Sequence, residues 1–132
     1  MTLQVALVVP DRELWSGTAS MVIAKTTEGD IGILTGHSPV FGVLAEGSLV
    51  EIRPAEGAEA AVTVRAAVSG GFLSVADDRV SVLAAQAQLS VEIDTSAAQH
   101  DLDSALAQAA AGTEEPADAK YARARLRAAG QA

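Results

Sequence analysis

The feature that most constrains the fold is a change of hydrophobic period at Asp94. Before it, short runs rich in β-branched residues stop at Gly, Pro or Asp, which is typical of strands and turns. Many short strands in succession predict a sandwich or a flattened barrel. After Asp94, apolar residues recur at helical spacing. The sequence therefore predicts a β domain over residues 1–93 and a helical segment over residues 94–132.

Six runs of the β domain are expected to be strands. In "SLVEIR" Val50 and Ile52 share one face, as in a half-buried strand. Breaks are expected at Pro10-Asp11, Ser16-Gly17, Gly70-Gly71 and Asp77-Asp78. The expected strands are 3–9, 18–26, 48–53, 59–68, 72–76 and 79–85, and Pro54 to Gly57 is expected to be an exposed hairpin tip.

The segment after Asp94 is expected to be an antiparallel hairpin of two helices. Asp94 suits the N-cap of the first helix, Gly112 can end it, and Pro116 fits the first turn of the second. The apolar stripes are mostly alanine, which buries little area at roughly 25 cal/mol per Å². They are Ala98, Leu102, Ala105, Leu106 and Ala109, then Tyr121, Ala124 and Ala128. We therefore expect a weakly docked arm that can detach from the β domain.

Composition excludes several functions. The net charge of −8 argues against nucleic acid, which needs a basic face. The absence of cysteine removes disulfides and thiolate chemistry, and no apolar run is long enough to span a bilayer or to act as a signal segment. Residues 120–132 carry four basic residues and no acid, which fits either an acidic partner surface or the C-terminal end of a helix dipole.

The stretch "EGDIGILTGHSPV" (28–40) has no pattern for phosphate binding or catalysis. Gly36 is followed by His37-Ser38, whereas a P-loop needs Lys and then Ser or Thr. Adjacent His and Ser rarely form a dyad, and His37 and His100 have no metal-ligand spacing. We predict no catalytic residue, no metal and no cofactor. The stretch is expected to be a rigid turn shaped by its three glycines, with Ile31 and Ile33 inward and Asp30 and His37 outward.

Two spaced motifs, Glu28 to Pro39 and "SGG" at 69–71, resemble the epsilon subunit of bacterial F-type ATP synthase, called delta in mitochondria. The resemblance covers residues 3–93 and extends through architecture to the helices, although Thr35 stands where the family usually has proline. It implies an α+β fold, with a flattened antiparallel β-sandwich of about ten strands followed by the two-helix hairpin. It also implies a non-catalytic subunit of the central stalk, peripheral to the cytoplasmic face of the plasma membrane.

The resemblance further implies partners and contact residues. The gamma subunit, the c ring and the catalytic alpha and beta subunits are the expected partners, with the membrane reached only through the complex. The arm is expected to inhibit ATP hydrolysis when it extends toward the catalytic subunits. The implied contacts are Asp30, Gly36 and His37 with the c ring, Gly47, Ser48 and Leu49 with gamma, and Arg123, Arg125 and Arg127 with an acidic segment of the beta subunit.

One departure concerns nucleotide. Some members of the family bind ATP through Ile-Asp-x-x-Arg-Ala at the foot of the first helix. Here Ile93 and Asp94 are present, but Ala97 replaces the arginine and Gln88 stands where a glutamate is expected. Because a guanidinium is the best phosphate partner, its loss predicts weak or absent ATP binding, with Asp94 kept mainly as a helix cap.

Two alternatives stay open at this point. The first is a stand-alone β-sandwich protein-binding module whose arm pairs with an unrelated helix. The second is an enzyme that uses His37 with an acid such as Asp30.

Overall fold

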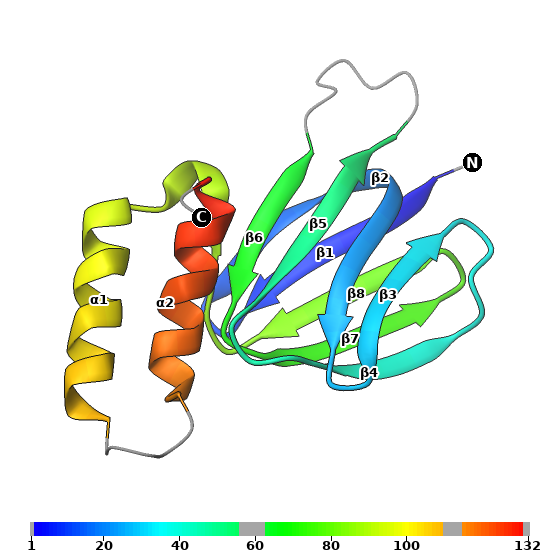
Figure 1. The fold of residues 1–132 in the computed structure, drawn as a ribbon. Coiled ribbons are helices and arrows are strands. Elements are labelled where there is room, and N and C mark those ends of the chain that lie inside the picture. Colours follow the sequence, from blue (N-terminus) through cyan, green and yellow to red (C-terminus); the bar gives the residue numbers. More distant parts are fainter. Residues whose placement is uncertain (1, 56–62, 110–114, 131–132) are drawn as a thin grey trace.

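The computed structural model of the chain describes residues 2–55, 63–109 and 115–130, and the structural statements below concern those residues. Figure 1 shows a β sandwich with two helices side by side at one end. The strands are β1 (Leu3–Val9), β2 (Arg12–Thr26), β3 (Gly29–Leu34), β4 (Val40–Leu44), β5 (Ser48–Pro54), β6 (Val64–Val68), β7 (Gly71–Ala76), β8 (Arg79–Ala84) and β9 (Ala87–Leu89). The helices are a 3-10 turn (Ser90–Glu92), α1 (Thr95–Gln108) and α2 (Ala117–Ala128).

One continuous sheet forms both layers of the sandwich. Its strand order is β1-β8-β7-β4-β2-β5-β6-β9, with β3 paired to β2 outside this path. β1 also pairs with β2, which brings the sheet back on itself. The predicted fold class is confirmed. The described residues form nine strands, in line with the expected number of about ten, and one pair, β1–β8, is parallel where an antiparallel sandwich was expected.

Aliphatic side chains fill the space between the layers. In β1, Leu3, Val5 and Leu7 are buried while Gln4 between them is exposed, which is the period of a half-buried strand. Burying such a side chain contributes about 1.5–3 kcal/mol, so these positions dominate the stability of the domain. The largest fully buried side chains are Leu3, Leu7, Val22, Ile33, Leu44, Val50, Ile52, Val68, Leu73, Val75, Val80 and Val82.

The predicted break at Ser16-Gly17 is wrong. β2 begins at Arg12 and runs through Gly17, which pairs with Val5 of β1. A Cβ added to Gly17 would lie 3.0 Å from the ring of Trp15. Gly17 is therefore a strand residue that leaves room for an indole, and glycine within a strand often marks such a close approach.

The predicted strand 59–68 is observed from Val64 onward, and β3, β4 and β9 are strands that the sequence did not predict. Residues 59–62 of that prediction, and Glu56 and Gly57 of the predicted hairpin tip, lie outside the described residues. Pro54, at the start of that tip, ends β5.

The two helices begin close to where they were predicted. Asp94 caps α1 as expected, because its Oδ1 accepts a hydrogen bond of 3.1 Å from the amide of Ala97. Pro116 is the N-cap of α2 rather than a residue of its first turn, and Gly112, predicted to end the first helix, lies outside the described residues.

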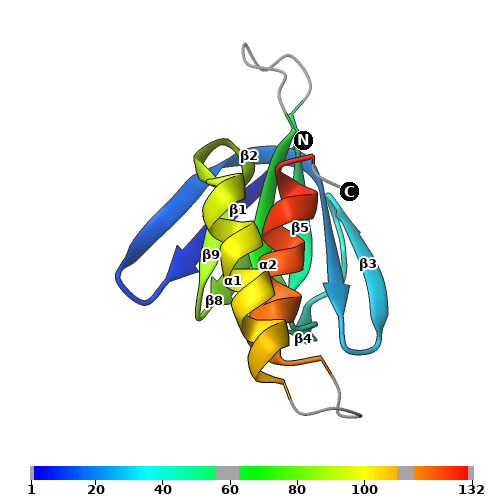
Figure 2. The same ribbon diagram turned by 60° about the vertical axis from the view of Figure 1, so that its left-hand side comes forward.

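Within the described residues, α2 makes the main contacts of the helix pair with the sheet. α2 lies between α1 and the strands, as Figures 1 and 2 show from two directions. Tyr121, Ala124 and Ala128 of α2 pack against Ala67 of β6, with Leu49 and Ile93 beside them. The opposite side of α2 packs against α1 through a second small cluster, Leu102, Ala105, Ala119, Ala122 and Leu126. The arm therefore rests on the sandwich mainly through alanine methyl groups.

Candidate interaction surfaces

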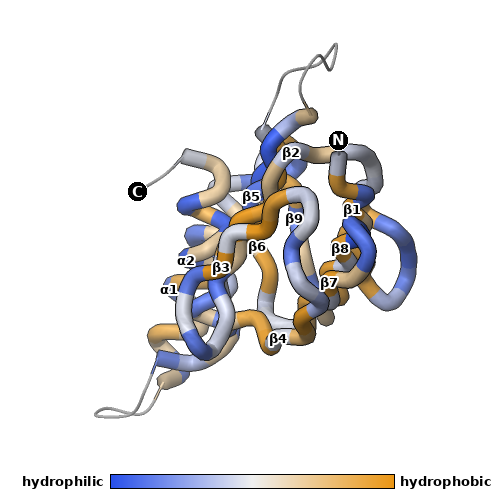
Figure 3. Tube along the Cα trace, turned by 90° about the vertical axis from the view of Figure 1, so that its right-hand side faces the viewer, coloured by the Kyte–Doolittle hydropathy of each residue, from blue (hydrophilic) through white to orange (hydrophobic). Residues whose placement is uncertain are grey.

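An apolar face covers the outer side of β4, β7 and β8. It consists of Phe41, Val43, Phe72 and Leu83, of which Phe41 is 66% and Phe72 46% exposed. The strand register places Val43 opposite Phe72 and Phe72 opposite Leu83, so the side chains form one row across three strands. The two phenyl rings stack with centroids 5.5 Å apart. Figure 3 shows the hydrophobic stretches of these strands lying together.

The apolar face continues onto β1. Val8 of β1 is the register partner of Leu83, and Val8, Val9 and Pro10 line a shallow cavity of about 410 Å³ beside Phe72. Contiguous exposed apolar surface of this kind marks a protein interaction site. This face was not predicted from the sequence. The sequence pattern that could have revealed it is the placement of the chain's two phenylalanines, Phe41 and Phe72. Each occupies an outward-facing position of its strand, next to residues that point toward the core.

The stretch from Glu28 to Val40 is a strand with a turn at each end, so the prediction of one rigid turn is wrong. Gly29 and Gly36 have positive φ, at 126° and 85°. Gly32 does not have a positive φ, because it lies inside β3 opposite Ile23. A Cβ on Gly32 would meet the methyl group of Met21 at 3.0 Å, so this glycine accommodates a neighbour.

The three residues predicted to contact a c ring are not in one place. Asp30 lies near the start of β3, whereas Gly36 and His37 follow its end. A strand of that length spans roughly 20 Å. Asp30 is exposed, His37 is partly exposed, Ile33 is fully buried and Ile31 is partly buried, so the predicted inward and outward directions are confirmed.

The turn after β3 is held by a distant residue. The amide of Gly36 donates a 2.6 Å hydrogen bond to Oδ1 of Asp78, which is 42 residues away in the β7–β8 turn. His37 donates its amide to Leu34, and its Nδ1 lies 2.7 Å from the carbonyl oxygen of Ser38. That contact is to the backbone of Ser38, so the geometry gives no His–Ser dyad. The described residues also contain no cluster of three potential metal ligands.

Residues predicted for three different partners meet beside α2. A cavity of about 390 Å³ is lined by Asp30, by Gly47 to Leu49, and by Arg127 of α2. Gly47 and Ser48 are buried, and Leu49 packs against the helix. With α2 in this position, Gly47 is covered by the chain's own arm.

The contact between Gly47 and α2 is very close. Gly47 has φ of 61°, and a Cβ placed on it would lie 2.3 Å from the carbonyl carbon of Lys120. Its carbonyl oxygen accepts a 3.1 Å hydrogen bond from Nη2 of Arg127. Nζ of Lys120 lies 3.9 Å from the Glu46 carboxylate. The turn between β4 and β5 is therefore the docking site for α2 on the sandwich, and Gly47 is the residue in closest contact.

The three arginines predicted to meet a catalytic subunit all have partners within the chain. Arg123 pairs with Glu115, and Arg127 donates to Gly47. Arg125 is 9% exposed, donates a 2.8 Å hydrogen bond to Asp101 of α1, and lies over the ring of Tyr121 at 5.4 Å. Burial raises the pKa of Tyr121, the Arg125 cation opposes the rise and Glu92 adds to it, so the phenol stays neutral beneath the guanidinium.

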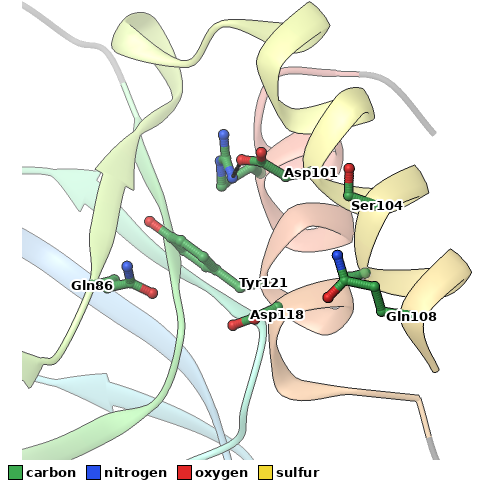
Figure 4. Close-up of a pocket in the computed structure, with 8 residues that line it drawn as sticks. Gln86, Asp101, Ser104, Gln108, Asp118 and Tyr121 are labelled. Atoms are coloured by element: carbon green, nitrogen blue, oxygen red, sulfur yellow. Dashed lines mark hydrogen bonds and ion pairs between the residues drawn. The ribbon is translucent and has the colours of Figure 1, made fainter. Parts of the chain in front are cut away.

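The cavity between the helices does not fit a triphosphate. Figure 4 shows it lined by Asp101, Ser104 and Gln108 of α1, by Asp118 and Tyr121 of α2, and by Gln86 on the side of the sheet. Its volume is about 320 Å³, and the one cation in its lining is Arg125, already bonded to Asp101. Nε of Arg125 has no partner among the described residues, but one donor is too few for a polyphosphate.

The residues of the ATP motif have other uses. The Asp94 carboxylate accepts from the helix amide of Ala97, and Ile93 packs beside Tyr121 and Ala67. Both residues therefore have structural roles in this conformation, and weak or absent ATP binding stays a prediction.

We predict that titration of the full chain with ATP gives no saturable binding at micromolar concentrations. The expected reason is that the arginine of the motif is missing at Ala97, an exposed position on α1. Isothermal titration calorimetry is the measurement, and the Ala97→Arg variant is the matched control, for which we expect measurable affinity. A micromolar dissociation constant for the unaltered chain contradicts the prediction.

The fold and its apolar face define a class of protein, a β-sandwich binding module with a helical arm. The chain belongs to the ATP synthase delta/epsilon chain family, whose β-sandwich domain model matches residues 2–90. It is 50% identical over 118 residues to the ATP synthase epsilon chain of Streptomyces coelicolor, covering 89% of this chain and 91% of that one. It is 52% identical over 126 residues to that of Thermobifida fusca, covering 95% and 90%.

Solved structures share the fold. A chain of the Euglena gracilis mitochondrial ATP synthase (OSCP/F1/c-ring) matches with a TM-score of 0.69 at 23% identity, over 98% of this chain and 78% of that one. A chain of the central stalk and c-ring of the Tetrahymena thermophila enzyme matches with a TM-score of 0.56 at 19% identity, over 98% and 91%.

The family resemblance read from the two motifs is thereby confirmed. As a member of the family, the chain is a non-catalytic subunit of ATP synthase. Family membership therefore replaces the two alternative interpretations, a stand-alone binding module and an enzyme. No helix in the described part of the chain is long and apolar enough to cross a membrane.

Proposed function

We propose that the chain couples the gamma subunit to the c ring in the central stalk, at the cytoplasmic face of a bacterial plasma membrane. The observation that carries this proposal is the apolar face of Phe41, Val43, Phe72 and Leu83. Two phenyl rings held in water on a rigid sheet are unfavourable unless another protein covers them. The similar assemblies, one with F1 and the c-ring and one with the central stalk and c-ring, support the choice of partners.

The gamma subunit binds the apolar face in this proposal. The family resemblance assigned that contact to Gly47, Ser48 and Leu49. These residues remain a second candidate only for an arm that has left the sandwich, because α2 covers Gly47 and packs against Leu49. The apolar face lies on β4, β7 and β8, away from α2, and is free whether the arm is docked or not.

The c ring meets the polar ends of β3. Gly36 and His37 at one end and Asp30 at the other are too far apart for one small loop. A ring of identical subunits presents the same polar loop repeatedly around its circumference, so the two ends can meet different copies. The membrane is reached only through these contacts.

The arm regulates ATP hydrolysis in this proposal. Docked on Gly47, it keeps Arg125 buried and Arg123 and Arg127 occupied, so the arginines are withheld from the alpha and beta subunits. Released, it presents them to acidic residues of the beta subunit and restrains rotation. The small alanine contacts between α2 and β6 support such a release.

The proposed gamma contact is tested by replacing Phe41 and Phe72 together with glutamate. Removal of two central aromatic residues from an interface typically costs about 2–4 kcal/mol, so we expect affinity for the gamma subunit to fall at least about 30-fold. Calorimetric titration with the cognate gamma subunit is the measurement.

The matched control is Val91→Glu, since Val91 is 90% exposed on the 3-10 turn outside the apolar face. This variant is expected to bind gamma like the unaltered chain. An equal loss of affinity in both variants, or no loss in the double variant, contradicts the assignment of the face.

A further inference from the structure

Asp77 and Asp78 form a two-residue turn between β7 and β8, with φ of 51° and 60°. Such turns, with both residues in the left-handed region, usually carry glycine, because a side chain is strained there. Asp and Asn are the side chains that tolerate it best. The chain keeps a carboxylate at the second position, so the role of that carboxylate needs a structural explanation.

The carboxylate of Asp78 is used outside its own turn. Its Oδ1 accepts the 2.6 Å hydrogen bond from the amide of Gly36, while its carbonyl oxygen accepts a 2.8 Å bond from the amide of Gln4 at the start of β1. One residue therefore joins the β7–β8 turn to the edge of β1 and to the connection between β3 and β4. Figure 1 shows that turn beside the connection, at the end of the sandwich away from the helices.

The connection has few other ties. Within residues 35–39, His37 bonds to Leu34 and to its neighbour Ser38. Among the described residues, Asp78 is the one distant side chain that bonds to this connection. Asp77, next to it, has no such bond in the described structure and is exposed. The position of His37 relative to the sheet therefore depends on Asp78.

We propose that Asp78 is a positioning residue, whose carboxylate holds the Gly36–His37 turn in the conformation that the c ring binds. This inference rests on the proposed contact of His37 with the c ring. A turn fixed before binding loses less conformational entropy on contact, which raises affinity without adding a contact. Asp78 itself need not touch the ring.

The test compares Asp78→Gly with Asp77→Gly, two changes that relieve the same backbone strain. Only the first removes the acceptor for Gly36. Asp78→Asn keeps an oxygen acceptor and removes the charge, so it separates the hydrogen bond from electrostatics. Each full-length variant is examined by amide hydrogen exchange at Gly36 and by its affinity for the purified gamma–c-ring complex, with His37→Ala as the reference for loss of the contact.

We expect Asp78→Gly to speed exchange at Gly36 at least tenfold and to weaken binding about five- to twentyfold. Asp77→Gly and Asp78→Asn are expected to stay within about twofold of the unaltered chain in both measurements. Unchanged exchange at Gly36 in Asp78→Gly overturns the inference. Faster exchange with unchanged affinity also overturns it, provided that His37→Ala binds more weakly. If His37→Ala binds normally, the proposed c-ring contact fails, and the positioning role fails with it.

Discussion

Replacement of Gly47 by alanine is expected to release the helical arm from the sandwich. The added Cβ would lie 2.3 Å from the carbonyl carbon and 2.4 Å from the carbonyl oxygen of Lys120. Both are backbone atoms of α2, so no side-chain rotation can relieve the overlap. The left-handed backbone at Gly47 adds about 1–2 kcal/mol for a residue with a side chain. The helix must therefore move away from the turn.

The contacts that hold α2 are too few to resist this change. Ala124 and Ala128 add about one buried methyl group each, at about 0.8 kcal/mol, and Tyr121, which is buried against Ala67, is the one large side chain that α2 contributes to the contact. The Lys120–Glu46 pair is partly exposed at 3.9 Å and contributes about 0–1 kcal/mol. Docking of the arm therefore depends on Tyr121, two alanine methyl groups and a weak ion pair, and we expect the backbone clash at Gly47 to exceed these contacts.

Hydrogen exchange of the helix amides measures the release. We expect protection in α1 and α2 to fall about 100-fold or more in Gly47→Ala, while β1, β7 and β8 keep theirs. Gly36→Ala is the matched control, because Gly36 also has positive φ but nothing lies within 4 Å of the added Cβ. Retained protection of α2 in Gly47→Ala contradicts the assignment of Gly47 as the docking site.

The sequence predicted the elements that depend on local periodicity. Asp94 caps α1, and Tyr121, Ala124 and Ala128 face the sheet as their spacing indicated. The sequence-based prediction was wrong where a glycine lies inside a strand and leaves space for a neighbouring side chain, instead of forming a turn. Gly17 leaves room for Trp15, and Gly32 for Met21, yet both look like breaks in the sequence. Such glycines are recognised only when the strand opposite is known.

The burial of Arg125 could not be predicted from the sequence for a related reason. α2 has two buried sides, one toward the sheet through Tyr121 and Ala124 and one toward α1 through Ala119 and Ala122. A helix buried on two sides has polar residues at the boundary between those sides. Arg125 lies at that boundary and is hydrogen-bonded to Asp101 of α1. Alanine fits any interface, so its spacing did not show that both sides were packed.

Gly47→Ala is also expected to change ATP hydrolysis by the cognate catalytic head. If the docked arm keeps its arginines from the catalytic subunits, the substitution raises the fraction of molecules whose arm is released and able to inhibit ATP hydrolysis. A loss of about 2.7 kcal/mol of docking free energy shifts that equilibrium about 100-fold. We therefore expect half-inhibition of the stripped head at a concentration of Gly47→Ala at least tenfold lower than that of the unaltered chain.

A second variant separates release from contact. Arg123, Arg125 and Arg127 replaced together by glutamine on the Gly47→Ala background keep the arm released but remove its charge. We expect this variant to bind the head and to inhibit at least tenfold more weakly than Gly47→Ala, and we expect the inhibition by Gly47→Ala to weaken at 1 M salt, where the Debye length falls to about 3 Å. Equal inhibition by the unaltered chain and Gly47→Ala contradicts a regulatory arm, because a docked and a released arm would then act alike on the catalytic subunits.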